Sequence, residues 1–300
     1  MREYRKLVAL SLMFAAMGLG SPCDARGQSN ASGEATNIRF NVTRRMACGE
    51  LRDDQPSEAA LRLVCLRERL GAEKITLRNA IVIAFVGGFV KNNDGKHPEV
   101  QFAALLRKSY PSILHAEVFA NHDGKRALRR VLQLLDTDGD GVISNAEKEQ
   151  ASIIIYGHSW GASQAVTLAR ELGEQGIPVL LTIQVDSVHK PGHKDSTIPS
   201  NVRSAVNFYQ TKGPIHGRSR VHAADPERTN IIGNFEMRYQ NRQINCDNYP
   251  WLARHLNRGH HEIENDPRVW QQIASLIDAE LSKGTLAVEA SPPFSPLPLK

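Results

Sequence analysis

The residues best suited to nucleophilic chemistry form the pattern Gly157-x-Ser159-x-Gly161. The apolar residues 153–156 directly precede it, and an alanine-rich stretch with helical periodicity follows. A serine on a tight turn between a strand and a helix has a strained backbone, and only very small residues fit beside it. The turn raises the serine hydroxyl above the sheet and leaves the Trp160 N–H at the helix start, where it can stabilise an oxyanion. The pattern predicts a nucleophile at Ser159; an ordinary glycine-bounded turn is the simpler alternative.

A second group of residues has the spacing of a calcium-binding loop of the EF-hand type. Within residues 136–147, oxygen ligands are available at loop positions 1, 3, 5, 7, 9 and 12, and Gly141 is at position 6. The predicted metal ligands are Asp136, Asp138, Asp140, the carbonyl of Val142, Ser144 and Glu147. Oxygen-only ligands favour Ca²⁺. Because EF-hand loops usually pair and this sequence contains only one, we expect a structural ion; an acidic surface turn is the alternative.

Strand and helix patterns alternate along the chain and must position these residues. Short apolar runs that predict buried strands lie at 80–86, 116–120, 153–156, 179–185 and 205–209. Helical patterns lie at 100–107, 125–135, 162–172 and 267–281. This alternation predicts one α/β domain over residues 75–282, with a mostly parallel sheet, helices on both faces, and the EF-hand-like loop inserted before the strand that carries the serine.

The serine motif in this setting resembles the α/β-hydrolase superfamily, on its lipase, esterase and thioesterase side. The resemblance covers residues 75–282. It implies that the catalytic residues follow one another in the order nucleophile, acid, histidine. It also implies that backbone N–H groups just after the first strand complete the oxyanion hole, which makes Gly88 and Phe89 the candidates beside Trp160.

Asp186 is the predicted acid because it directly follows the apolar run 179–185, at the same sheet edge as Ser159. Its role would be to orient the catalytic imidazole and stabilise its charged form. Many members of the superfamily place the acid one strand later, so Asp225 remains the competitor. A loop cap without catalysis is the alternative reading of Asp186.

His260 is the predicted base because it lies in a stretch, expected to be a loop, that leads into the last amphipathic helix, where the superfamily carries its histidine. Relatives often show an apolar residue at +3, proline at +7 and an apolar residue at +9, which Ile263, Pro267 and Val269 match. His261 misses this register by one residue and is the alternative. A metal site formed by these two histidines is not expected, since adjacent side chains diverge. His158, next to the serine, is interpreted as local packing.

The N-terminus reads as an export signal, with basic residues before the apolar run 7–19 and predicted cleavage after Ala25. A lipoprotein acylated at Cys23 is the less favoured alternative, since Pro22 fits such a signal poorly. Residues 26–74 form a linker and a small segment in which Cys48 and Cys65 are the expected disulfide, leaving Cys246 unpaired. Residues 283–300 contain four prolines and predict a disordered tail.

Composition limits the function classes. Hydrophobic residues make up 41% and charged residues 23%, which excludes disordered, collagen-like and polytopic membrane proteins. The net charge of +5 is scattered and aromatic residues are only 6%, so no nucleic-acid partner is expected. Beyond the export signal, no segment reaches membrane-spanning length.

Together these features predict a secreted or periplasmic serine hydrolase acting on a small-molecule ester or thioester, with Ca²⁺ as a structural ion. The polar stretch Gln210–Trp251, expected to cover the site, argues against long-chain triglyceride. A non-catalytic calcium-binding extracellular protein on the same scaffold is the alternative.

Overall fold

The computed structural model of the chain describes residues 80–111, 113–240 and 244–289, with side chains up to residue 282. The predicted signal peptide, the linker segment with Cys48 and Cys65, and residues 290–300 lie outside the described residues. Cys246 is described, and it is a buried free cysteine.

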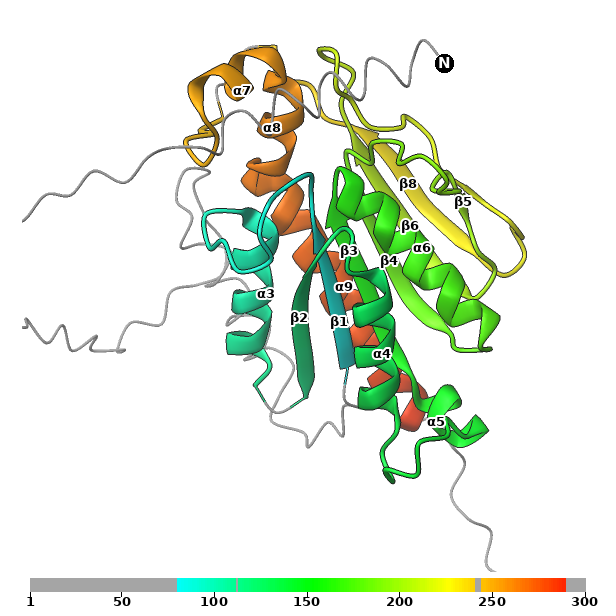
Figure 1. Cartoon of the computed structure of the whole chain (residues 1–300). Coiled ribbons are helices and arrows are strands. Elements are labelled where there is room, and N and C mark those ends of the chain that lie inside the picture. Colours follow the sequence, from blue (N-terminus) through cyan, green and yellow to red (C-terminus); the bar gives the residue numbers. More distant parts are fainter. Residues whose placement is uncertain (1–79, 112, 241–243, 290–300) are drawn as a thin grey trace, which may run out of the picture. The chain divides into compact units, whose positions relative to one another are not determined.

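A six-stranded sheet forms the centre of the described domain (Figure 1). Its spatial order is β2-β1-β3-β4-β6-β8, and every neighbouring pair is parallel. The strands are β1 (Ala80–Val86), β2 (Leu114–Ala120), β3 (Ser152–His158), β4 (Val179–Val185), β6 (Val202–Tyr209) and β8 (Asn230–Glu236). A separate small ladder pairs β5 (Thr197–Ile198) with β7 (His222–Ala223). The five predicted strands are all present, and this is the sheet of the α/β-hydrolase fold expected from the sequence.

Helices cover both faces of the sheet, as predicted. One face packs against α3 (Pro98–Ser109) and α9 (Pro267–Glu289), and the other against α4 (Gly124–Leu135) and α6 (Trp160–Glu174) (Figure 1). Strand β1 shows why its sequence is apolar throughout: alternate residues enter opposite cores, and all seven are buried. Burying one such side chain contributes about 1.5–3 kcal/mol, so this two-sided burial dominates the stability of the scaffold.

Three short helices complete the described domain: α5 (Asn145–Gln150), α7 (Trp251–Leu256) and α8 (Arg258–Glu264). Helix α8 corrects the prediction that His260 lies in a loop. The seven-residue helix escapes periodicity arguments because six of its residues, 259–264, are buried, so it shows no amphipathic pattern.

Helix α9 is longer than the predicted helical pattern at 267–281. The backbone is helical to Glu289, because the apolar residues 286–288 continue the helix and the first proline occurs only at 292. In the described part of the chain no helix is both long enough and apolar enough to cross a membrane.

The parallel sheet brings the ends of separate strands to one edge. Gly87 follows β1, Ser159 follows β3 and Asp186 follows β4, so all three lie at the carboxyl edge of the sheet. Ligands of open α/β sheets bind at this edge.

Two glycines allow the backbone to turn sharply at Ser159. A Cβ atom on Gly161 would lie 2.3 Å from the carbonyl oxygen of Phe85 in β1, and one on Gly157 would lie 2.5 Å from the carbonyl carbon of Gly161. Both contacts are with backbone atoms, so no side-chain rotation can relieve them. The turn therefore needs glycine at both positions.

We predict that Gly161→Ala destabilises the protein by about 1–3 kcal/mol, the usual penalty for forcing an extra methyl group into a packed site. The measurement is the midpoint of urea unfolding. Gly95→Ala is the matched control, because no described atom lies within 4 Å of its Cβ position and its φ is ordinary. Equal midpoints for Gly161→Ala and the wild type would contradict this account of the turn.

Candidate active site

Ser159 occupies the turn between β3 and α6 in a strained conformation. Its φ of 57° and ψ of −125° lie in a region that side-chain-bearing residues rarely adopt. The backbone N–H of Ser159 donates to the carbonyl of Val185 at the end of β4, with an N···O distance of 2.9 Å. The turn is thereby fixed to the neighbouring strand.

The structure brings Ser159, His260 and Asp186 together in one hydrogen-bonded chain. The Ser159 Oγ lies 3.0 Å from His260 Nε2, and His260 Nδ1 lies 2.6 Å from Asp186 Oδ2. The carboxylate can only accept, so Nδ1 carries the proton and Nε2 accepts from the serine hydroxyl. This is the tautomer that a general base needs in order to activate a serine.

Asp186 is fully buried, and its orientation is set by three donors besides His260. Gln210 donates through its backbone N–H at 3.1 Å and its side-chain Nε2 at 2.9 Å, and the Gly217 N–H donates at 2.7 Å. Gly217 is required there, because its Cβ would lie 2.5 Å from the backbone carbonyl carbon of Asp186. Part of the polar stretch expected to cover the site thus holds the acid in place.

The two alternative residues lie apart from this chain of contacts. Asp225 is partly exposed and caps a local turn by accepting from the Glu227 N–H at 3.0 Å. His261 faces the ring of Tyr249, with centroids 3.6 Å apart, and burial lowers its pKa to about 2, so it stays neutral. Among these candidates, Asp186 and His260 are the residues that form a hydrogen-bonded chain with Ser159.

The predicted oxyanion loop lies beside the nucleophile. A Cβ on Gly87 would be 3.0 Å from Ser159 Cβ, and the exposed Phe89 ring meets Trp160 edge-on, with centroids 6.1 Å apart. Trp160 is the first residue of α6, and N–H groups in a first helical turn have no acceptor within their own helix. The loop after β1 is tied down by Asn121, whose side-chain amide donates to the Gly88 carbonyl.

A lysine links the loop that follows Asp186 to the oxyanion loop. Lys190 Nζ donates to the backbone carbonyl of Asn121 at 2.7 Å and lies 3.2 Å from its Oδ1. Asn121 therefore contacts both loops that border Ser159.

His158 packs against the His260 ring, in keeping with the packing role expected from the sequence, but it also lies beside two buried glutamates that the sequence did not reveal. Its ring lies 4.5 Å from the His260 ring between centroids, with an interplanar angle of 32°. Its Nδ1 lies 3.5 Å from a Glu99 oxygen and 3.8 Å from a Glu264 oxygen. Burial lowers the pKa of His158 well below its usual range.

The predicted loop 136–147 begins directly after α4 and ends in the first turn of α5, and part of its predicted ligand set converges. Carboxylate oxygens of Asp136, Asp138 and Glu147 lie within 4.8 Å of one another. Asp140 accepts instead from the Val142 N–H at 2.7 Å and is not part of this group. Gly141 has a φ of 81°, as the sixth position of such a loop requires.

These residues fit a hard cation. Asp136 Oδ1 is a buried oxygen that has no hydrogen-bond partner among the described residues. The Glu147 carboxylate accepts from the backbone N–H groups of Ser144 and Thr137, which lower its pKa to about 2 and keep it ionised. A buried bare oxygen beside two further carboxylates is a donor set suited to Ca²⁺.

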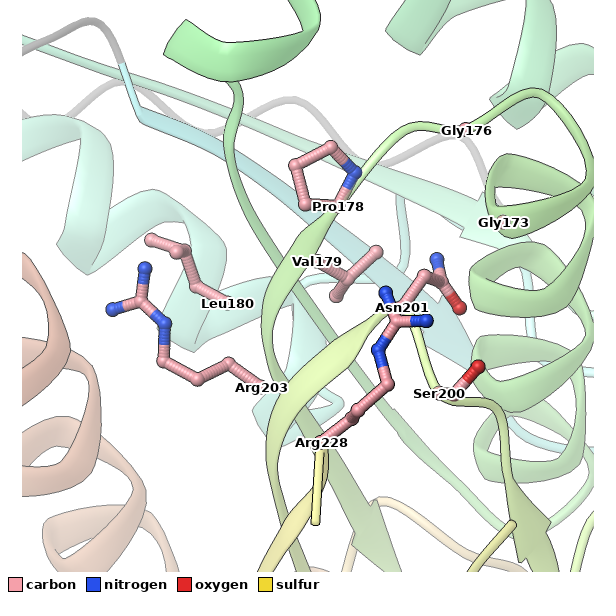
Figure 2. Close-up of a pocket in the computed structure, with 9 residues that line it drawn as sticks. All are labelled: Gly173, Gly176, Pro178, Val179, Leu180, Ser200, Asn201, Arg203 and Arg228. Atoms are coloured by element: carbon pink, nitrogen blue, oxygen red, sulfur yellow. The ribbon is translucent and has the colours of Figure 1, made fainter. Parts of the chain in front are cut away.

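A surface pocket lies at the opposite edge of the sheet, where β4 and β6 begin, and Figure 2 shows the residues that line it. They include Val179 at the start of β4 and the side chains of Arg203 and Arg228. Because Ser159 and Asp186 lie beyond the carboxyl ends of the strands, this pocket does not belong to the triad.

Comparisons with known proteins add little to this geometry. No protein-family model and no curated protein matches the chain. Among solved structures, an arylesterase is 12% identical with a TM-score of 0.38, covering 69% of this chain and 76% of the arylesterase. A YdeN-like hydrolase from Pectobacterium atrosepticum is 12% identical with a TM-score of 0.36, covering 76% of this chain and 99% of its own.

A type II thioesterase of the yersiniabactin biosynthetic pathway is 11% identical with a TM-score of 0.35, covering 70% of this chain and 96% of the thioesterase. Similarities this distant do not indicate an activity for this chain.

We predict that Ser159 reacts covalently with a fluorophosphonate, and that His260→Ala slows this labelling by about 10²–10⁴-fold, the usual contribution of a general base. His261→Phe should label at nearly the wild-type rate, because phenylalanine keeps the packing against Tyr249. Asp186→Asn should slow labelling and Asp225→Asn should not. If His261→Phe lowered the labelling rate more than His260→Ala did, His261 and not His260 would be the base.

Proposed function

We propose that this chain is a serine hydrolase that cleaves an ester or thioester bond. The observation that carries the proposal is the chain of hydrogen bonds from Ser159 through His260 to Asp186, at the carboxyl edge of a parallel sheet. A serine hydroxyl is a weak nucleophile by itself, and it becomes reactive when a base with a fixed tautomer removes its proton. The strained backbone at Ser159 supports the same role.

The reaction begins when Ser159 Oγ attacks the carbonyl carbon and its proton passes to His260 Nε2. Asp186 stabilises the imidazolium that forms, without taking the proton itself. The Trp160 N–H and an N–H from Gly88 or Phe89 would stabilise the oxyanion of the tetrahedral intermediate. His260 then protonates the leaving alcohol or thiol, and water, activated by the same histidine, hydrolyses the acyl-enzyme.

The surroundings of the site favour a small or partly polar substrate. Phe89 and Trp160 provide an aromatic surface beside Ser159, whereas the segment from Gln210 to Gly217 that holds Asp186 is polar. An aromatic contact with neighbouring polar groups suits a short acyl chain or an aryl ester better than a long aliphatic chain. The N-terminal signal motif supports export of the enzyme as part of this proposal.

The test is steady-state hydrolysis of matched p-nitrophenyl esters of increasing acyl length, the corresponding thioesters, and an anilide. We expect turnover of short esters or thioesters that is lost in Ser159→Ala, with weak activity on the anilide because its leaving group is poorer. If the folded wild type neither turns over these substrates nor labels with fluorophosphonate, the non-catalytic calcium-binding protein becomes the better description.

We further propose that loop 136–147 holds a structural Ca²⁺ ion through Asp136, Asp138 and Glu147, with Asp140, the Val142 carbonyl and Ser144 completing the ligands. The converging carboxylates and the unpartnered Asp136 oxygen support this part of the proposal. The loop leads through α5 into β3, the strand that ends at the nucleophile turn. An ion there would stabilise the start of that strand.

Calcium at a hundredfold excess over its dissociation constant should stabilise the protein by about 2.7 kcal/mol. For a domain of this size the melting temperature should rise by roughly 5–10 °C. Glu147→Gln should remove this shift, while its side-chain oxygen still supports the cap of α5 with Ser144. The measurement is thermal unfolding followed by circular dichroism, in EDTA and in calcium. Coincident wild-type curves would contradict calcium binding.

A further inference from the structure

A buried cluster of two histidines and two glutamates lies directly behind the catalytic histidine. It consists of His97, Glu99, His158 and Glu264, which we call the His/Glu cluster; none is more than 4% exposed. His97 precedes α3 and Glu99 lies in its first turn, whereas His158 ends β3 and Glu264 ends α8. Three separate parts of the fold therefore bring polar side chains close together in the interior.

The donor atoms of the cluster are close enough to share one ion. His97 Nδ1 lies 2.7 Å from Glu264 Oε1, and ligand atoms of His97, Glu99 and Glu264 lie within 4.8 Å of one another. His158 lies next to this group, with its Nδ1 at 3.5 Å from Glu99 Oε1 and 3.8 Å from Glu264 Oε2. The three donors of His97, Glu99 and Glu264 are close enough to share a single metal ion, and His158 would join them after a small movement of its ring.

The cluster is not satisfied by the protein alone. Within the described part of the chain, no group outside the cluster and its neighbour His260 satisfies either oxygen of Glu99 or either ring nitrogen of His158, although the Glu99 and Glu264 carboxyl groups are close enough to share a hydrogen bond. Glu264 is better supported, because it contacts His97 and accepts from the Tyr249 hydroxyl. Burial raises the pKa of both glutamates and lowers that of His158, so each ionised group is costly here without a counter-charge.

We propose that the His/Glu cluster is a binding site for a divalent transition-metal ion of the Zn²⁺ type, ligated by His97, Glu99, His158 and Glu264. Two carboxylates balance the charge of the ion, and two neutral imidazoles favour such a metal over Ca²⁺ or Mg²⁺. The outer contacts also fit: Tyr249 donates to Glu264, and His97 Nε2 lies 3.9 Å from Asp94 Oδ2. Ligating histidines commonly direct their second nitrogen toward a carboxylate.

A metal at this point would fix the position of the catalytic base. Glu264 lies one helical turn after His260 on α8, and the rings of His158 and His260 are in contact. The ion would connect α8 to α3 and β3 and would restrain His260 without contacting substrate. Its role is thus structural, and it is separate from the calcium loop between α4 and α5.

The competing interpretation is a proton shared between the Glu99 and Glu264 carboxyl groups, which also relieves like-charge repulsion. The two interpretations differ in a quantity that does not depend on activity, namely the amount of metal bound per chain.

Zinc content can be measured on the full-length purified protein carrying Glu147→Gln, so that the calcium loop does not contribute. The protein is stripped with chelator, incubated with Zn²⁺, separated from free ion by gel filtration, and analysed by mass spectrometry of the metal. We expect one zinc ion per chain. Glu99→Gln and Glu264→Gln should each weaken zinc binding by at least about 100-fold, since loss of even an outer-shell partner costs about 10–100-fold.

Glu262→Gln is the matched control, because Glu262 is equally buried on α8 but pairs with Arg258 at 2.8 Å instead of joining the cluster. It should retain zinc. Cobalt substitution tests the site without these variants: Co²⁺ bound to the parent protein should give the intense visible absorption of a low-symmetry four-coordinate site. The proposal would be overturned if the parent protein bound no zinc, or if Glu99→Gln bound as much zinc as the parent. The proton shared between Glu99 and Glu264 would then be the better interpretation.

Discussion

The close contact of three backbone segments at Gly157, Gly161 and β1 is the constraint on which the site depends. The turn can exist only because neither glycine carries a Cβ, and the contact fixes the start of α6 against the carboxyl end of β1. Ser159 is forced to a positive φ as a result, and its hydroxyl faces the imidazole of His260. The strain is maintained by apolar packing on both sides of the sheet, which is far larger in free energy than the few kcal/mol that such a conformation costs.

The rest of the triad is held by polar contacts that are themselves buried. Asp186 accepts hydrogen bonds from Gln210 and Gly217, which lie in the segment after β6. This segment therefore holds Asp186 in position, and Asp186 in turn orients His260. A buried carboxylate with all its partners in place is rigid, and loss of one partner leaves a charge without compensation. Preorganisation of this kind is what a hydrolase requires, because reorienting dipoles during the reaction would raise the barrier.

Much of the scaffold was predictable from the sequence. Buried parallel strands leave continuous apolar runs, so Ser159 and Asp186 could be placed at strand ends and His260 ahead of the last helix. Strand β8 was not predicted because it is an edge strand with one neighbour, so its sequence mixes polar and apolar residues. Helix α8 was missed because a helix buried on nearly every side has no periodic pattern.

The hydrogen-bond partners that position the site residues could not be identified from the sequence. Gln210, Gly217 and Asn121 come from loops, and their roles depend on tertiary contacts across 24 to 33 positions of the chain. The His/Glu cluster joins residues separated by 167 positions. No local spacing rule connects such residues, whereas the calcium-type loop could be predicted from twelve consecutive positions because all its expected ligands are local.

The burial of α8 restricts the movement of His260 in the proposed site. Since residues 259–264 are enclosed, the helix that carries His260 cannot swing outward without exposing buried charge and apolar surface together. The exposed ring of Phe89 lies against Trp160 beside Ser159, and exposed side chains of this kind rotate on a fast timescale. The proposed site therefore combines an enclosed His260 with a mobile aromatic side chain at its surface.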